Sequence, residues 1–385
     1  MNPSVPPATI PFNRPFLTGQ ETDYIRQAVE SGKISGNGLF TQRCQQFLER
    51  RYGFRKVLLT TSCTDALEMA AILADVGPGD EVIVPSFTFV STALAFVRQG
   101  ARIVFADSRA DHPNLDLDRV ADLITPRTKV LVVVHYAGVA CDMDAAMELA
   151  RRHNLLVVED AAQAIDATYR GRPLGGIGHL GTFSFHETKN IIAGEGGALV
   201  VTDERFARRA EIIWEKGTNR AEFFRGEINK YGWVDVGSSF LPSEIIAAFL
   251  YAQLEHLDAI QDKRKQLWQT YFAELSPLET PGLLTLPTIP NWASNNAHMF
   301  YLACRSLPER TALIAHLKSH GIQAVFHYLP LHESPFYAAR HDGRALPNAQ
   351  RFADGLVRLP MFYDLATDQV AGICAAIRDF YATRG

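Results

Sequence analysis

The sequence predicts an α/β protein that has a large domain with a seven-stranded, mostly parallel sheet and a small C-terminal α+β domain. Between residues 57 and 203, seven short runs rich in Val, Ile, Leu and Phe follow one another, and the first five are separated by lengths that suit crossover helices. The chain has 385 residues. This length exceeds the ~250 to 300 residues at which a single hydrophobic core stops growing. We therefore expect helices on both faces of the sheet and a second, smaller domain.

The predicted strands share polar residues at or just after their carboxyl ends. In chain order the strands are KVLLTTS, EVIVPSF, RIVFADS, KVLVVVHYAG, LLVVEDAAQ, GTFSFHE and GALVVTD. The polar residues are Ser62, Thr88, Asp107, His135, Asp160 and His186. Because open α/β sheets bind ligands outside the carboxyl ends of their strands, we expect the functional site at this edge.

The remainder of the chain predicts a linking helix and the small domain. A helical pattern runs from Pro242 to Glu274, and Pro277 lies beyond its end. After it, AHMFYLACRS and GIQAVFHYLPLH are predicted strands, and RTALIAHLKSHG and DQVAGICAAIRDFYATRG are predicted amphipathic helices. We accordingly divide the chain into a disordered lead at 1–9, a large ligand-binding domain at 10–255 and a small domain at 256–385.

Composition argues against several classes of partner. A net charge of -4 and a pI near 6.3 show no basic excess for binding nucleic acid or an anionic membrane. The five cysteines are odd in number and form no C-x-x-C pair, which argues against a disulfide framework or a structural zinc site and fits a reducing cytoplasm. No apolar run approaches the ~18 residues of a membrane span. We expect a cytoplasmic protein without nucleic-acid or membrane partners.

Two segments at the carboxyl edge suit an anionic, aromatic ligand. In TTSCTDALEM a strand ends at Ser62 and a helix begins at once, so backbone N–H groups around Cys63 and Thr64 attract a phosphate. The alternative is that Ser62 or Thr64 acts only as a helix N-cap. Phe89 follows the next strand and could stack on a ring, although a Phe at such a position is usually plain core.

The acidic pair in LLVVEDAAQA divides into one structural and one functional candidate. Side chains alternate along a strand, so Glu159 and Asp160 cannot both face the same way. A carboxylate at the site edge, 29 residues before Lys189, is what pyridoxal phosphate needs opposite its ring nitrogen. The alternatives are that Asp160 caps a following helix and that Lys189 is an ordinary solvated charge.

Two further motifs are not interpreted as sites. GIGHLG, at residues 176–181, matches G-x-G-x-x-G, but a strand follows it instead of preceding it, so a turn is favoured. His327 and His332 are five residues apart, with Pro330 between them and no H-E-x-x-H pattern. We therefore expect no metal site.

The order of these motifs resembles the sugar aminotransferases of the DegT/DnrJ/EryC1/StrS family. The matching features are the phosphate cradle, the ring-stacking aromatic residue, EDAAQ, SFHETKN, GEGG and HYLPLH. The likeness extends from IPFNRPFLTGQE to the C-terminal helix. It implies fold type I of the pyridoxal-phosphate-dependent transferases, with the cofactor bound by the large domain.

The resemblance also implies a role for each cofactor residue. Lys189 corresponds to the Schiff-base lysine, Asp160 to the partner of the pyridine nitrogen and Gln163 to the partner of the ring 3-oxygen. The residues implied to hold the phosphate or to stack on the ring are Cys63, Thr64, Ser184 and Phe89.

One departure from the family concerns a contact between subunits. The family commonly shows G-Y-N-Y-R where this chain has GSSFL at residues 237–241, so Ser239 replaces the Asn that reaches the phosphate from the neighbouring subunit. A serine hydroxyl can still donate to phosphate but reaches less far. The resemblance implies a homodimer with shared active sites, in which residues 215–240 cross to the partner. The candidate substrate-binding residues are Lys216, Arg220, Arg225, Lys230 and His332.

The implied reaction moves an amino group from L-glutamate to a nucleotide-diphosphate keto sugar, with pyridoxamine phosphate formed between two half-reactions. KVLLTTSCT, VHYAGVACDMD and VGSSFLPSE favour amination at C4 of a 4-keto-6-deoxy sugar for surface polysaccharide. Amination at C3 needs the same catalytic set and remains open, as does a cofactor-bound regulator without turnover. A relative that removes a hydroxyl group carries His at the lysine position, so Lys189 counts against that activity.

Overall fold

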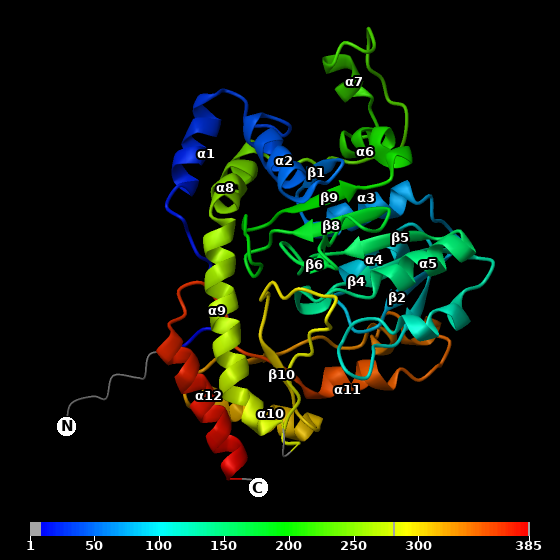
Figure 1. Cartoon of the computed structure of the whole chain (residues 1–385). Coiled ribbons are helices and arrows are strands. Elements are labelled where there is room, and N and C mark those ends of the chain that lie inside the picture. The colour runs from blue at the N-terminus through cyan, green and yellow to red at the C-terminus, as the bar shows by residue number, and fades with distance from the viewer. Residues whose placement is uncertain (1–8, 280–281, 384–385) are drawn as a thin grey trace.

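The seven predicted strands form one sheet. The computed structural model describes residues 9–279 and 282–383, and the strand order is β1-β9-β8-β5-β4-β2-β3 (Figure 1). Neighbouring strands run parallel except for β9, which is antiparallel to both β1 and β8. The prediction of a seven-stranded, mostly parallel sheet is confirmed. The strands are β1 Val57–Thr60, β2 Glu81–Pro85, β3 Arg102–Ala106, β4 Thr128–Val134, β5 Leu156–Asp160, β8 Leu180–Ser184 and β9 Gly197–Val201.

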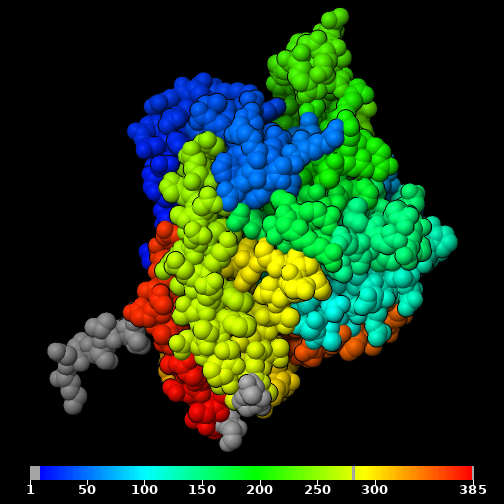
Figure 2. Space-filling view, in the orientation of Figure 1, coloured from blue at the N-terminus to red at the C-terminus, as the bar shows by residue number. Residues whose placement is uncertain are grey.

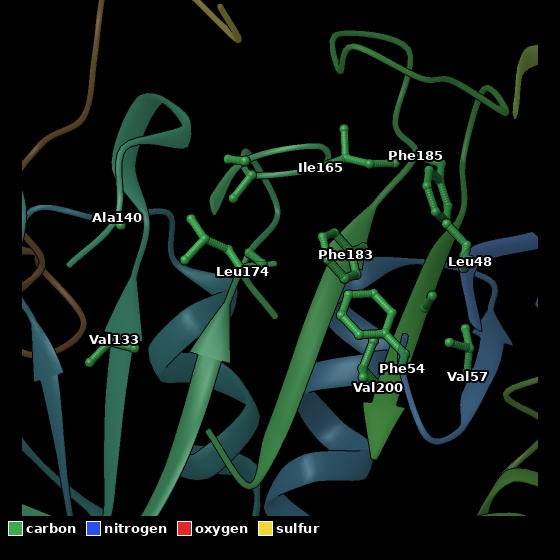
Figure 3. Packing of buried hydrophobic residues seen from close by; sticks show 14 of the residues in the cluster. Leu48, Phe54, Val57, Val133, Ala140, Ile165, Leu174, Phe183, Phe185 and Val200 are labelled. Carbon is green, nitrogen blue, oxygen red and sulfur yellow. The ribbon is translucent and has the colours of Figure 1, made fainter. Parts of the chain in front are cut away.

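Helices cover both faces of the sheet because successive strand residues point to opposite faces. On β4, Val130 joins the apolar cluster that contains α3, α4 and α6, whereas its neighbour Leu131 joins the cluster with α2, α5 and α8. In the latter cluster the rings of Phe54 and Phe183 lie 5.8 Å apart (Figure 3). No helix within the described ranges is long and apolar enough to cross a membrane. The helices to this point are α1 Glu21–Glu30, α2 Leu39–Tyr52, α3 Cys63–Leu73, α4 Ser91–Arg98, α5 Met143–His153, α6 Ala207–Trp214, α7 Arg220–Phe224 and α8 Glu244–Glu255.

The connection from β3 to β4 differs from the prediction of a crossover helix. It contains two short 3-10 helices, Leu117–Arg119 and Ala121–Leu123. The Asn114 side chain holds this segment against the loop after β4, where it donates to the Val139 carbonyl and accepts from the Tyr136 N–H. These contacts between distant segments replace the regular hydrogen bonds of a helix, and the length of the connection gave no sign of them.

The C-terminal part holds a three-stranded sheet of order β10-β12-β11. Both predicted strands and both predicted helices are present, but the central strand, β12, was not predicted. It is three residues long and follows α11 with no turn between them, so it lacks the signals that mark a strand. A two-stranded hairpin, β6 Thr168–Tyr169 with β7 Arg172–Pro173, was missed for the same reason of length. The elements are α9 Leu257–Leu275, β10 Tyr301–Ala303, α10 Leu307–Ser319, β11 Val325–Phe326, α11 Pro347–Gly355, β12 Leu356–Arg358 and α12 Thr367–Ala382.

The segment before α1 joins the C-terminal part. Ile10 forms a parallel bridge with Ile322, donating to the Gly321 carbonyl at 2.8 Å. Further on, the Met361 N–H donates to the Phe12 carbonyl at 3.3 Å. The disordered lead predicted for residues 1–9 lies outside the described residues except for Thr9. Ile10 and Phe12 are therefore part of the folded structure.

Glu159, on β5, is fully buried and anchors the sheet to the turn that precedes β8. Its carboxylate is 2.9 Å from His135 Nε2. It also accepts hydrogen bonds from the backbone N–H groups of Gly175, Ile177 and Gly178. Burial alone would raise the pKa of this carboxyl, but the His135 contact and the N–H groups hold it below its usual value. Glu159 is therefore the structural member of the acidic pair.

We predict that Glu159→Ala lowers the free energy of unfolding by ~3 to 5 kcal/mol, because it leaves His135 and three buried N–H groups without their acceptor. Urea denaturation monitored by circular dichroism measures this loss. Glu148→Ala is the matched control, since the Glu148 side chain on α5 is 40% exposed and its ion pairs within the described residues are with Arg151 and Arg152.

The loss should also depend on pH. The folded-state pKa of Glu159 is lowered, so its contribution is fully present above the unfolded value near 4.5 and disappears as pH falls through the folded value. The difference in the free energy of unfolding between the wild type and Glu159→Ala should become smaller in that acidic range. Equal and small losses for both glutamate variants at neutral pH would contradict the anchoring role.

Candidate active site

One cavity of about 780 Å³ opens at the carboxyl edge of the sheet. Residues at the ends of β4, β5 and β8 form one side of it, and His298, Tyr328 and Arg358 of the C-terminal part form another. Among the described residues, no group of three or more His, Cys, Asp or Glu side chains is arranged to hold a metal ion. Seven of the predicted cofactor residues line the cavity: Cys63, Thr64, Phe89, Asp160, Gln163, Ser184 and Lys189.

The predicted phosphate cradle is the beginning of α3. Ser62 is the N-cap and its side chain accepts a hydrogen bond from the Asp65 N–H at 3.1 Å, so the capping interpretation of Ser62 holds. Ser62, Cys63 and Thr64 also line the cavity, which places the positive end of the helix toward a ligand. Beneath the cradle lies Gly197, the first residue of β9. A Cβ atom there would lie 2.5 Å from the Cys63 nitrogen, so this position requires glycine.

Asp160 ends β5 at the cavity wall and is 6% exposed. Thr92 Oγ1 donates to Asp160 Oδ2 at 2.7 Å, and the Ala162 N–H donates to Oδ1 at 3.1 Å. The alternative that Asp160 caps a helix is wrong, since residues 161–167 contain turns and no helix. Two donors thus fix the carboxylate while it still faces the cavity.

The loop between β8 and β9 carries Lys189, and backbone hydrogen bonds close it. The Glu187 N–H donates to the Gly194 carbonyl at 2.9 Å, and the Lys189 N–H donates to the His186 carbonyl at 2.9 Å. Gly194 has φ +76°, a conformation that glycine adopts without strain. The GEGG cluster therefore serves the turn of this loop, in addition to the close approach at Gly197.

The residue after the lysine ties the same loop to the C-terminal part. Asn190 is buried, and its side-chain amide donates to Gln261 Oε1 on α9 at 2.7 Å and to the Asn296 carbonyl at 2.9 Å. Its oxygen lies 2.8 Å from His298 Nδ1. Lys189 thus lies between the hydrogen-bonded loop that joins β8 to β9 and the side-chain network of Asn190.

Lys189 is not the solvated charge that one interpretation of the sequence allowed. Burial lowers the pKa of its amine, and the charge of Asp160 opposes that shift only in part. Burial likewise raises the pKa of the Cys63 thiol, which keeps the thiol protonated. A primary amine with a lowered pKa faces the cavity beside a fixed carboxylate.

Gln163 connects the two sides of the cavity. Its Oε1 accepts from the Ala137 N–H at 2.6 Å, and its Nε2 donates to the Tyr328 hydroxyl at 3.1 Å. Tyr328, with His298, Arg358 and the carboxylate partner Thr92, was not identified from the sequence. For Tyr328 the HYLPLH motif was a signal, but attention fell on its histidines.

Six predicted residues lie outside the cavity. Five of them belong to the segment 215–239, here called the arm, which stands out from the body around α7 (Figures 1 and 2): Lys216, Arg220, Arg225, Lys230 and Ser239. Glu215 and Ser239 pair at its base. His332 lies elsewhere in the fold, buried with its Nδ1 2.7 Å from Ser86 Oγ. In the single chain, His332 is therefore positioned for packing and does not reach the cavity.

The residues present fit pyridoxal phosphate. The cradle at α3 suits a phosphate, the amine of Lys189 suits an aldehyde, and Asp160 suits a protonated ring nitrogen. Phe89, at the mouth of the cavity and 55% exposed, is available to cover a ring face. The fold and this site define a pyridoxal-phosphate-dependent aminotransferase.

Comparison with known proteins identifies the family. The DegT/DnrJ/EryC1/StrS aminotransferase family matches residues 15–378. The chain is 32% identical to the spore coat polysaccharide biosynthesis protein SpsC of Bacillus subtilis over 96% of both chains. It is 35% identical to GDP-perosamine synthase of Caulobacter vibrioides over 84% of this chain and 85% of the relative. The chain belongs to this family of sugar aminotransferases.

Solved structures agree on the fold and the cofactor. Spr1654 of Streptococcus pneumoniae in its PMP form superposes with a TM-score of 0.89 at 26% identity, covering 97% of this chain and 99% of that protein. Its PLP form gives a TM-score of 0.88. The cofactor of this chain is pyridoxal 5'-phosphate, which alternates with the pyridoxamine form.

We predict that Asp160→Asn retains some cofactor but loses ~3 to 5 kcal/mol of transition-state stabilisation, because an amide cannot hold the ring nitrogen protonated, and each ~1.4 kcal/mol is worth tenfold in rate. Turnover per mole of bound cofactor measures the loss. Asp107→Asn is the control: Asp107 also follows a strand, but it accepts from the N–H groups of Asn348 and Ala349. A fall in turnover of less than tenfold for Asp160→Asn would leave its role purely structural.

Proposed function

We propose that this protein transfers an amino group from L-glutamate to C4 of a nucleotide-linked 4-keto-6-deoxy sugar. The observation on which the proposal rests is the cavity, where Lys189, Asp160 and the α3 cradle meet. In its sequence motifs the chain resembles dTDP-4-amino-4,6-dideoxygalactose transaminase. The names of two relatives, GDP-perosamine synthase and a spore coat polysaccharide biosynthesis protein, support a nucleotide-linked acceptor and a role in surface polysaccharide. We further propose that it acts in the cytoplasm.

Lys189 would move the proton in both half-reactions. Desolvation lowers the pKa of its amine, and this shift assists Nζ in taking the proton from Cα of glutamate. In the reverse sense, Nζ would deliver a proton to C4 of the sugar. The hydrogen-bonded loop that joins β8 to β9 and the anchored Asn190 restrict where this amine can lie.

The bound cofactor would supply an electron sink for the substrate carbon that loses its proton. Asp160 would keep the ring nitrogen protonated, and the Thr92 hydroxyl would keep Asp160 oriented. Gln163 would bond the ring 3-oxygen, while Ser184, Cys63 and Thr64 would hold the phosphate.

The alternatives are amination at C3 and a regulator without turnover. The C3 reaction uses the same catalytic residues, so an acceptor assay must separate it from the C4 reaction. A regulator without turnover would hold the cofactor through the same Lys189, so conversion of the bound cofactor by glutamate separates the enzyme from the regulator.

We propose that the protein is a homodimer with shared sites. The arm exposes a group of large apolar side chains, which is typical of an interaction surface: Phe223, Phe224, Tyr231, Trp233, Val234 and Val236. The base of the arm lies beside the cradle, because the Thr61 N–H donates to the Phe240 carbonyl at 3.1 Å. In a two-fold dimer that packs on this face, the arm of each subunit would arrive at the other's cradle. Ser239 could then reach the partner's phosphate, and Lys216 and Arg220 could meet the pyrophosphate of the sugar nucleotide.

The acceptor can be tested directly. Purified protein, glutamate and a panel of dTDP-, UDP- and GDP-linked 3-keto and 4-keto sugars should give an amino sugar only from 4-keto acceptors, with the new C–N bond assigned by NMR. Product with nitrogen at C3 would replace the proposal by the C3 alternative. No product from any acceptor, while glutamate still converts the cofactor, would reject a sugar nucleotide as acceptor.

Mixed dimers test the sharing of sites. Lys189→Ala should be colourless and inactive, and Ser239→Asp should be inactive because it sets a carboxylate against the partner's phosphate. If the sites are shared, mixing the two variants at equal concentration and allowing the subunits to exchange should restore about a quarter of the wild-type activity. Half of the dimers are then mixed, and each mixed dimer has one intact site out of two. Native mass spectrometry confirms the exchange. No recovery after confirmed exchange would refute sharing through Ser239.

A further inference from the structure

Arg358 stands in the cavity wall without an anionic partner. It is the last residue of β12 and lies across from Tyr301 and Val325 in the small sheet. Its guanidinium lies 4.7 Å from the centre of the Phe12 ring. One of its NH2 groups is 3.5 Å from the Phe326 carbonyl, while its Nε is buried without a hydrogen-bond partner. No carboxylate of the described residues pairs with it.

The Arg358 side chain is half-buried, but its Nε is buried without an acceptor, and such a charged group favours an anionic ligand. Burial lowers the pKa of Arg358, yet arginine does not lose its proton in proteins, so its charge stays in the wall. Within the described ranges, Lys189 and Arg358 are the Lys and Arg side chains that line the cavity. Glu195, which also lines it, is exposed and faces His186 at 3.7 Å. A bound ligand can supply the anion that the described side chains do not.

The position of Arg358 indicates which ligand. Arg358 ends β12 in the C-terminal part, and His298 and His327 of the same part line the cavity with it. The phosphate cradle belongs to a different part of the chain, the beginning of α3. There the N–H groups and the positive end of the helix already suit the phosphate of the cofactor. The pyrophosphate of a sugar nucleotide is bulky and suits the exposed arm. A small carboxylate attached to the reacting carbon, next to Lys189, suits this buried position.

We propose that Arg358 binds a carboxylate of the amino donor. This inference rests on the proposed function. The free Nε and its neighbouring N–H groups form a planar fork that matches a carboxylate, and hydrogen bonds between two charged groups are stronger than those between neutral ones. It would hold the donor with Cα at Lys189 Nζ. Arg358 is thus a specificity residue for the donor, with no part in proton transfer.

The variants Arg358→Met and Arg358→Lys test the assignment in the donor half-reaction alone. The rate of this half-reaction is measured as the conversion of the pyridoxal form into the pyridoxamine form. We expect the glutamate concentration at half-maximal rate to rise roughly 100-fold for Arg358→Met and less for Arg358→Lys, which keeps the charge but loses the fork. The Michaelis constant for the nucleotide sugar should stay near the wild-type value. Arg340→Met is the control, since Arg340 is exposed in the same part of the chain and stacks on Phe336.

A binding measurement that does not depend on turnover completes the test. Calorimetric titration of succinate, an unreactive dicarboxylate, into the pyridoxal form should show a matching loss of affinity in Arg358→Met. Equal losses with glutamate and L-alanine would assign the α-carboxylate to Arg358, and a loss with glutamate alone would assign the side-chain carboxylate.

Two results would overturn the inference: unchanged binding of succinate and glutamate, or a loss confined to the sugar nucleotide or to cofactor loading. Failure of the proposed function looks different. In that case the wild-type protein itself would not react with glutamate, or would react with glutamate and aminate no sugar.

Discussion

The site depends on the opposed directions of two adjacent carboxylates at the end of β5. Glu159 is drawn away from the cavity by His135 and three backbone N–H groups, and this fixes where the strand ends and which face each side chain takes. Asp160 is thereby turned into the cavity, where Thr92 and Ala162 hold it. A slip of one residue in this strand would exchange the two environments and leave a carboxylate buried without its donors.

The elements that the sequence predicts well are those whose contacts are local or periodic. The strands of the large sheet show as apolar runs, and the alternation along β5 separates Glu159 from Asp160 without any structure. The cradle at Cys63 follows from a strand end next to a helix start. Lys189 follows from its place after a strand and before a glycine cluster, although its assignment as the reactive amine also needed the family resemblance.

What the sequence does not reveal comes from contacts between distant segments. Arg358 lies in a strand of three residues, and Tyr328 lines the cavity beside its hydrogen-bond partner Gln163, 165 residues earlier in the chain. His332 was a reasonable candidate from its motif, but its ring is directed to Ser86. The side chain of each such residue is placed by packing of the C-terminal part on the sheet, which no local pattern encodes.

The hydrogen bonds between the first described residues and the C-terminal part set the order in which the molecule can assemble. Ile10 and Phe12 find their partners near residues 321 and 361. At usual rates of synthesis, roughly 15 to 60 s pass between the emergence of Ile10 and that of Gly321 from the ribosome. Until then the sheet can form, but one wall of the cavity is missing. During translation the apolar sheet can therefore mature before the protein has a closed pocket, and the pocket becomes competent to retain pyridoxal phosphate only when the last quarter of the chain has been made.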